Sequence, residues 1–159
     1  MILAQLTTYG LKIKDIPSDG HCMYHAVADQ IKQKNLPIVD EMAGFQHLRK
    51  ITSEYMLAHP DNFLPFMGLD EITGGGTDYA FIIYCNRVET TADCGCQLEL
   101  RALAGASRIP TEVFSSKGDV LMMGRKFVDG ADENAPKLQL TYHFHYYALG
   151  EHFNSVTPF

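Results

Sequence analysis

The chain has 159 residues, which fits one domain with a core large enough to fold without disulfide staples. Hydrophobic residues make up 46% of it and charged residues 20%, as in soluble globular proteins. A net charge of −6 argues against nucleic acid as the main ligand, and the longest strongly apolar stretch, Ala80–Cys85, is too short to cross a bilayer. We therefore expect a single domain over residues 1–159, monomeric and not membrane-bound.

The four cysteines are Cys22, Cys85, Cys94 and Cys96. A domain of this size does not need a disulfide framework, and the first residues lack the basic start and long apolar run of a secretory signal. The sequence thus predicts a reducing compartment, the cytoplasm by default or else the nucleus.

The first two-thirds of the chain indicate helices, because apolar residues recur at helical spacing. The expected helices are one from Cys22, one from about Glu41 to His59 ended by Pro60, a short turn over Asn62–Met67, a buried one carrying Tyr79–Val88 after a Thr77 or Asp78 cap, and one over Gln97–Arg108.

The last third indicates strands: two short ones on either side of Lys117-Gly118-Asp119 and, from Lys137 onward, a segment in which apolar and polar residues alternate. The expected strands are Thr111–Ser115, Val120–Met123, Lys137–Tyr146 and, after a turn at Leu149–Glu151, His152–Val156. Helices followed by a small, mostly antiparallel sheet make an α+β fold.

Cys22 follows a loop with the sequence Pro17-Ser18-Asp19-Gly20-His21 and lies where the first helical pattern begins. Unpaired backbone N–H groups and the positive end of the helix dipole favour a thiolate there. Most free cysteines are only core residues, but this position favours a nucleophile.

The residues before Cys22 suit a catalytic loop. Gly20 allows backbone amides to approach a ligand, so the amides from Asp19 to Cys22 could form an oxyanion hole. Asp19 is expected to cap the helix, to shape the loop or to do both, and His21 to line the cleft or tune the thiolate.

His152 is the candidate general base, and Asn154 supports it. Residues i and i+2 of a strand share a face, so the Asn154 amide can hold the imidazole ring and its tautomer. His25 is a competing base, because it lies one helical turn after Cys22, but its side chain leans along the helix surface.

Other polar clusters give weaker signals. His143 and His145 share one strand face and could chelate a metal, yet no paired ligand spacing supports this, so we expect no metal and no cofactor. Cys94 and Cys96 could form a redox pair, which defines a third and weakest functional class.

A cysteine at a helix start and a histidine beside a final hairpin follow the plan of papain-like cysteine peptidases. Three segments resemble the ovarian tumour (OTU) deubiquitinase family in the same order along the chain. They are Asp19-Gly20-His21-Cys22-Met23-Tyr24, the helix Gln97-Leu98-Glu99-Leu100-Arg101-Ala102-Leu103-Ala104, and Gly150-Glu151-His152-Phe153-Asn154-Ser155-Val156. The last segment is most similar to the branch whose OTU domain is carboxy-terminal, and the resemblance covers about Ile13 to Val156.

The resemblance implies a thiol-dependent isopeptidase that cuts between the ubiquitin C-terminal glycine and a lysine of a modified protein or ubiquitin chain. Cys22 is the implied nucleophile and His152 the base; Asn154 orients the base, and Asp19 with its neighbours organises the oxyanion site. The alternative is a catalytically weak or inactive ubiquitin-binding or scaffold module.

The family's variable loop corresponds in position to about Ile83–Asp93. The implied ubiquitin contacts there are Val88, Glu89, Thr90, Thr91 and Asp93. The chain differs from the family just after this loop, because Cys94-Gly95-Cys96 replaces the common Trp-Gly-Gly, and losing that aromatic removes packing beside the cleft.

Overall fold

The computed structural model of the protein describes residues 2–17, 19–34, 36, 44–63, 76–92, 97–116, 120–124, 137–143 and 152–159. The helices are α1 (Ile2–Thr8), α2 (Cys22–Gln33), α3 (Phe45–Ala58), the 3-10 turn η1 (Pro60–Asn62), α4 (Gly76–Thr90) and α5 (Gln97–Ser107). The strands are β1 (Leu11–Lys14), β2 (Thr111–Ser115), β3 (Leu121–Met123), β4 (Leu138–His143) and β5 (His152–Pro158).

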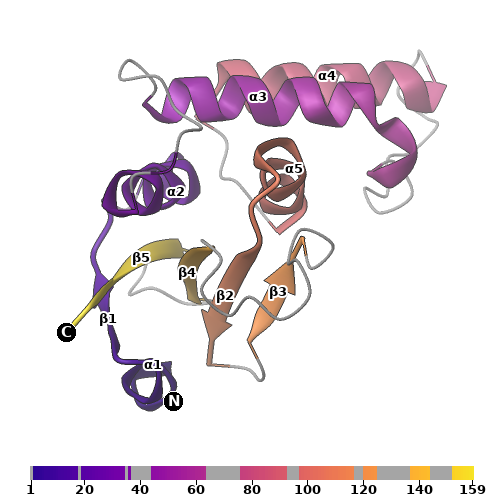
Figure 1. Ribbon diagram of the computed structural model, residues 1–159. Coiled ribbons are helices and arrows are strands. Elements are labelled where there is room, and N and C mark those ends of the chain that lie inside the picture. The colour runs from indigo at the N-terminus through magenta and orange to yellow at the C-terminus, as the bar shows by residue number, and fades with distance from the viewer. Residues whose placement is uncertain are drawn as a thin grey trace.

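The five strands form one sheet in the order β1-β5-β4-β2-β3. Strands β2 and β4 are parallel, and the other three pairs are antiparallel. Figure 1 shows α1 below the sheet, α2 and α5 above it, and the long pair α3 and α4 as an outer layer. The α+β class and the mostly antiparallel sheet expected from the sequence are confirmed.

The main core lies between α2 and the sheet. Alternation along β4 buries Leu138, Leu140 and Tyr142, and these residues share a cluster with Val27 of α2 and Phe153 of β5. Burying such a set supplies most of the stabilisation that orders this part of the chain.

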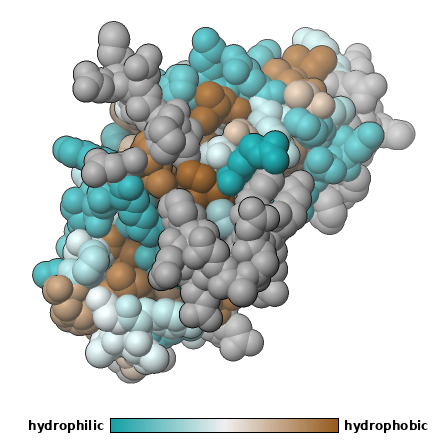
Figure 2. Space-filling view, in the orientation of Figure 1, coloured by the Kyte–Doolittle hydropathy of each residue, from teal (hydrophilic) through white to brown (hydrophobic). Residues whose placement is uncertain are grey.

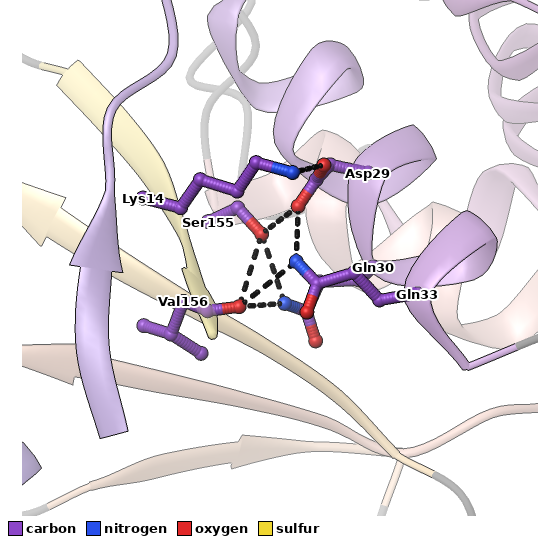
Figure 3. A network of polar contacts seen from close by, with 6 residues as sticks. All are labelled: Lys14, Asp29, Gln30, Gln33, Ser155 and Val156. Atoms are coloured by element: carbon purple, nitrogen blue, oxygen red, sulfur yellow. Dashed lines mark hydrogen bonds and ion pairs between the residues drawn. The ribbon is translucent and has the colours of Figure 1, made fainter. Parts of the chain in front are cut away.

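Polar contacts fix α2 on β5 (Figure 3). The Gln30 side chain donates to Ser155 Oγ at 2.8 Å and to the Val156 carbonyl at 2.7 Å. Asp29 accepts from Ser155 Oγ and pairs with Lys14 Nζ, both at 2.6 Å. The helix that begins at Cys22 is therefore held in register with the strand that begins at His152.

A second core lies between α3, α4 and α5. The Ser53 hydroxyl on α3 donates to the Cys85 carbonyl on α4 at 2.8 Å. Gly105 of α5 lies so close to Tyr55 that a Cβ on the glycine would stand 2.5 Å from the tyrosine oxygen. The close approach of α3 to both neighbours makes this layer a compact unit.

The first half of α4 carries apolar side chains that are exposed on its outer face. Tyr79 is 55% exposed, Ile82 47% and Ile83 43%, so the prediction of a buried helix is wrong for this face. Figure 2 shows hydrophobic side chains among hydrophilic ones on the surface of the α3–α4 layer.

No helix in the described ranges is long and apolar enough to cross a bilayer.

Several boundaries differ from the expectations. Helix α4 already begins at Gly76, so Thr77 and Asp78 lie inside it and neither is its cap. Helix α1 and strand β1 were not predicted; β1 exists because it pairs with β5, from Leu11 opposite Pro158 to Lys14 opposite Ser155. The rest of the expected turn after Phe63, the strand beyond His143 and the turn at 149–151 lie outside the described residues.

Candidate active site

Cys22 is the first residue of α2 and is buried, with 3% of its surface exposed. His21 occupies the N-cap position and makes no capping bond with its side chain. Asp19 shapes the loop instead: its Oδ1 accepts the His21 N–H at 2.8 Å, and its carbonyl accepts the Cys22 N–H at 3.3 Å. The N-cap role expected for Asp19 is wrong, because His21 occupies that position, and the bonds that Asp19 makes are those of a residue that shapes the loop.

Three backbone amides of this loop, those of Asp19, His21 and Cys22, are already engaged. The Asp19 N–H donates to the Pro17 carbonyl at 3.0 Å, and those of His21 and Cys22 donate to Asp19. An oxyanion between Asp19 and Cys22 would therefore compete with the Asp19 oxygens for the last two amides.

Gly20 is needed for a reason that the sequence did not indicate. A Cβ at this position would stand 1.6 Å from the carbonyl oxygen of Ala92, far inside van der Waals contact. The glycine thus lets the Cys22 loop pack directly against the backbone that follows α4.

Arg49 of α3 holds this loop, and sequence reasoning missed it. The side chain is 2% exposed and donates to His21 Nδ1 at 2.9 Å, to the Gly20 carbonyl at 2.9 Å and to the Val88 carbonyl at 2.8 Å. Its guanidinium lies 4.4 Å from the centre of the Tyr24 ring. An arginine in a helical pattern normally indicates solvent exposure, so only its place among buried neighbours could have revealed this role.

His21 is a neutral acceptor in this arrangement. Burial and then the Arg49 charge lower the pKa of the His21 ring, and its Nδ1 accepts the Arg49 Nε–H. The ring lines a cavity of about 550 Å³ beside the loop, together with Phe45 and Glu89. Neither Cys22 nor His152 is among the described residues that line this cavity, so the expectation that His21 lines the catalytic cleft stays a prediction.

His25 faces a different set of groups. Its ring centre lies 4.6 Å from that of Phe45, and its Nε2 is 4.0 Å from Asp19 Oδ2. These contacts place the ring against the loop and the start of α3.

His152 begins β5 and is 2% exposed. Its Nε2 lies 2.8 Å from Asn154 Oδ1, so the expected contact between ring and amide is present. The same oxygen accepts the Ile16 N–H at 2.8 Å. Because a backbone N–H can only donate, this bond identifies the amide oxygen, and His152 Nε2 must carry a proton. In its neutral form the ring then has its lone pair on Nδ1, which is the nitrogen that can accept a proton.

These bonds bring together the two ends of the chain that carry the candidate site. Asn154 Oδ1 ties the segment entering the Cys22 loop to β5, while Gln30 ties α2 to the same strand. The arrangement can hold a thiol at a helix N-terminus and an oriented imidazole on adjoining elements, the groups that nucleophilic acyl transfer requires.

The expected ubiquitin contacts lie mostly on helix, not on a loop, because α4 extends to Thr90. The expectation that Val88 contacts ubiquitin is wrong, because its side chain is 5% exposed and lies in the core, while its carbonyl accepts a hydrogen bond from Arg49. Glu89 and Thr90 are exposed and Thr91 is half-buried. Asp93, the Cys94–Cys96 segment and His145 lie outside the described residues, and within the described part no three metal-binding side chains cluster.

Comparison with known proteins identifies the family. The model of the OTU-like cysteine protease family matches residues 17–153. The chain belongs to this family. It is 40% identical over 156 residues to Deubiquitinase OTUD6B of Homo sapiens, an alignment that covers 98% of the chain and 50% of that protein. The chain thus spans about half the length of the curated relative it matches.

Solved structures agree with the papain-like OTU fold. The OTUD1 OTU domain superposes with a TM-score of 0.64 at 20% identity, covering 98% of this chain and 91% of that one. An OTU domain in complex with ubiquitin gives a TM-score of 0.60 at 15% identity, covering 92% of this chain and 69% of that one.

Proposed function

We propose that this chain is the catalytic domain of a cysteine-type deubiquitinase, which hydrolyses the isopeptide bond between the ubiquitin C-terminal glycine and a lysine. The OTU-like protease family, a relative named as a deubiquitinase and an OTU domain solved with ubiquitin support the proposal. The observation that carries it is the oriented imidazole of His152, held by Asn154 on the strand against which the Cys22 helix packs.

In the proposed reaction the Cys22 sulfur attacks the glycine carbonyl while His152 Nδ1 takes the thiol proton. The tetrahedral intermediate collapses, the C–N bond breaks, and the lysine amine leaves with the proton from His152. Water then attacks the thioester, with His152 as base. The C–S bond breaks, the Cys22 sulfur takes the proton back from His152, and the carboxyl group of ubiquitin is released. Asn154 keeps the other proton on Nε2, so that Nδ1 is the nitrogen that takes and returns protons, and it adds no negative charge.

We also propose that the end of α4 contributes to ubiquitin binding. Glu89 and Thr90 are exposed there, and Glu89 lines the cavity beside the Cys22 loop. A carboxylate at this place suits the basic tail of ubiquitin. Exchanging Glu89 and Asp93 for Lys should weaken ubiquitin affinity; unchanged affinity would remove this part of the proposal.

A ubiquitin with a thiol-reactive group at its C-terminus tests the function directly. We expect a covalent adduct at Cys22 that Cys22→Ala and His152→Ala abolish. Cys85→Ala is the matched control, because burial and then the nearby Glu99 raise the pKa of the Cys85 thiol to about 11. Binding without an adduct would instead support a ubiquitin-binding module.

The reaction requires a reduced thiol, so we propose that the domain works in the cytoplasm. We further propose that it acts as a monomer. Size-exclusion chromatography with light scattering tests the second point, and a dimer would contradict it.

A further inference from the structure

His143 lies beside the candidate active site, and the proposed function does not use it. In the pairing of β4 with β5, His143 stands opposite His152 and Thr141 stands opposite Asn154. Alternate residues of a strand share a face, so these four side chains form a block on one face of the sheet. The intervening pair, Tyr142 and Phe153, is buried in the main core.

Two polar contacts of His143 Nε2, with Thr141 and with Asn154, connect these four side chains. The Thr141 hydroxyl lies 2.9 Å from His143 Nε2, and the Asn154 amide nitrogen lies 3.4 Å from the same ring atom. Asn154 Oδ1 is already identified as an acceptor from the Ile16 N–H, so its Nδ2 is the donor that faces His143. For Asn154 Nδ2 to donate to it, His143 Nε2 must hold a lone pair, with the ring proton on Nδ1; the Thr141 hydroxyl is then a second donor to Nε2.

We propose that His143 is a positioning residue for the reaction: its ring accepts the Asn154 amide N–H and so fixes the amide that orients His152. The effect of His143 on catalysis rests on the proposed function. Its position rests only on the hydrogen bonds just described. If the Asn154 amide turned over, its Nδ2 would face the N–H groups of Ile16 and His152, and its Oδ1 would face the lone pair of His143 Nε2. An acceptor at position 143 therefore opposes that rotation, together with these two donors.

Protonation of His143 would break this arrangement, because Nε2 would then become a donor facing a donor. The structure opposes protonation: burial first, and then the neighbouring His152, lower the pKa of the His143 ring, while Asp15 raises it. His152 on β5 and Asp15 in the segment after β1 are the titratable groups that act on this ring. The ring therefore stays neutral, and the amide stays oriented, to a lower pH than an ordinary histidine would allow.

The test compares His143→Leu, which has no acceptor, with His143→Gln, whose amide oxygen can reach the position of Nε2 without titrating. His59→Gln, an exposed histidine near the end of α3, is the matched control. We expect His143→Leu to lower kcat on a fluorogenic ubiquitin substrate about fivefold with KM unchanged, as loss of one neutral hydrogen bond predicts. His143→Gln should recover most of that loss and make the acid limb of the pH profile less steep.

Two readouts do not depend on turnover. Nitrogen-15 spectra of the wild-type protein at pH 7.5 should show the His143 ring as the Nδ1–H tautomer. This measurement does not depend on whether the Leu variant folds. Mass spectrometry should show that alkylation of Cys22 by iodoacetamide, measured against pH, slows in His143→Leu but not in His59→Gln.

An Nε2–H tautomer would overturn the inference, and so would a folded Leu variant that matches the His59 control. If the tautomer and alkylation results hold but Cys22 does not react with ubiquitin probes, only the proposed function is refuted.

Discussion

Replacing Arg49 by Met should destabilise the domain and disturb the Cys22 loop. The arginine is 2% exposed and joins three elements through the Gly20 carbonyl, the His21 ring and the Val88 carbonyl. Methionine keeps a flexible apolar stem beneath the Tyr24 ring but donates to none of the three acceptors.

The size of the effect follows from the groups left behind. Each buried carbonyl without a donor costs about 1–3 kcal/mol, and the carbonyls of Gly20 and Val88 both lose theirs. Removing a buried cation returns part of its desolvation cost, which offsets some of this loss. The net expectation is a fall of about 3 kcal/mol in the free energy of unfolding. Arg49→Lys keeps the charge but not the planar fork, so it should lose about half as much.

Urea unfolding followed by circular dichroism measures the change, with Lys50→Met as the control on the same helix. Lys50 is exposed, so its replacement should shift the unfolding free energy by less than about 0.5 kcal/mol. The rate of Cys22 alkylation in the folded Arg49→Met protein should also change, since the loop loses its anchor. An Arg49→Met protein as stable as Lys50→Met would refute the reasoning.

Three further changes test other contacts. Gly20→Ala should lower both stability and Cys22 labelling, because its Cβ would overlap the Ala92 carbonyl; normal labelling would mean that the loop moves freely. Asn154→Ala should lower kcat about tenfold or more, because His152 loses its orienting acceptor, and unchanged steady-state rates would exclude that role. Burial raises the pKa of the Asp29 carboxyl, but hydrogen bonds led by the one from Lys14 outweigh burial and leave the pKa lowered. The stability that Asp29 adds is therefore present above its unfolded pKa and is lost as the pH falls through its folded pKa. Urea unfolding from pH 7 to pH 3 should show a steeper loss of stability in the wild type than in Asp29→Asn, and parallel losses would contradict this.

The local pattern of the sequence determined several elements of this protein. Periodicity placed α2 at Cys22 and α5 at Gln97, a short strand-like run before the turn residues at 117–119 placed β2, and alternation placed the buried face of β4. These predictions worked because each depends on residues within a few positions of one another. The contact between Asn154 and His152 belongs to the same class, since residues two apart on a strand share a face.

Tertiary structure decided the rest. Strand β1 exists because β5, from the far end of the chain, supplies its partners, and four residues alone give little signal. The burial of Arg49, the need for glycine opposite Ala92 and the inward position of Val88 all depend on segments that meet only after folding. A local pattern shows which face of an element is apolar, but the partner that covers that face, and the buried polar groups it brings, are fixed only when distant segments pack.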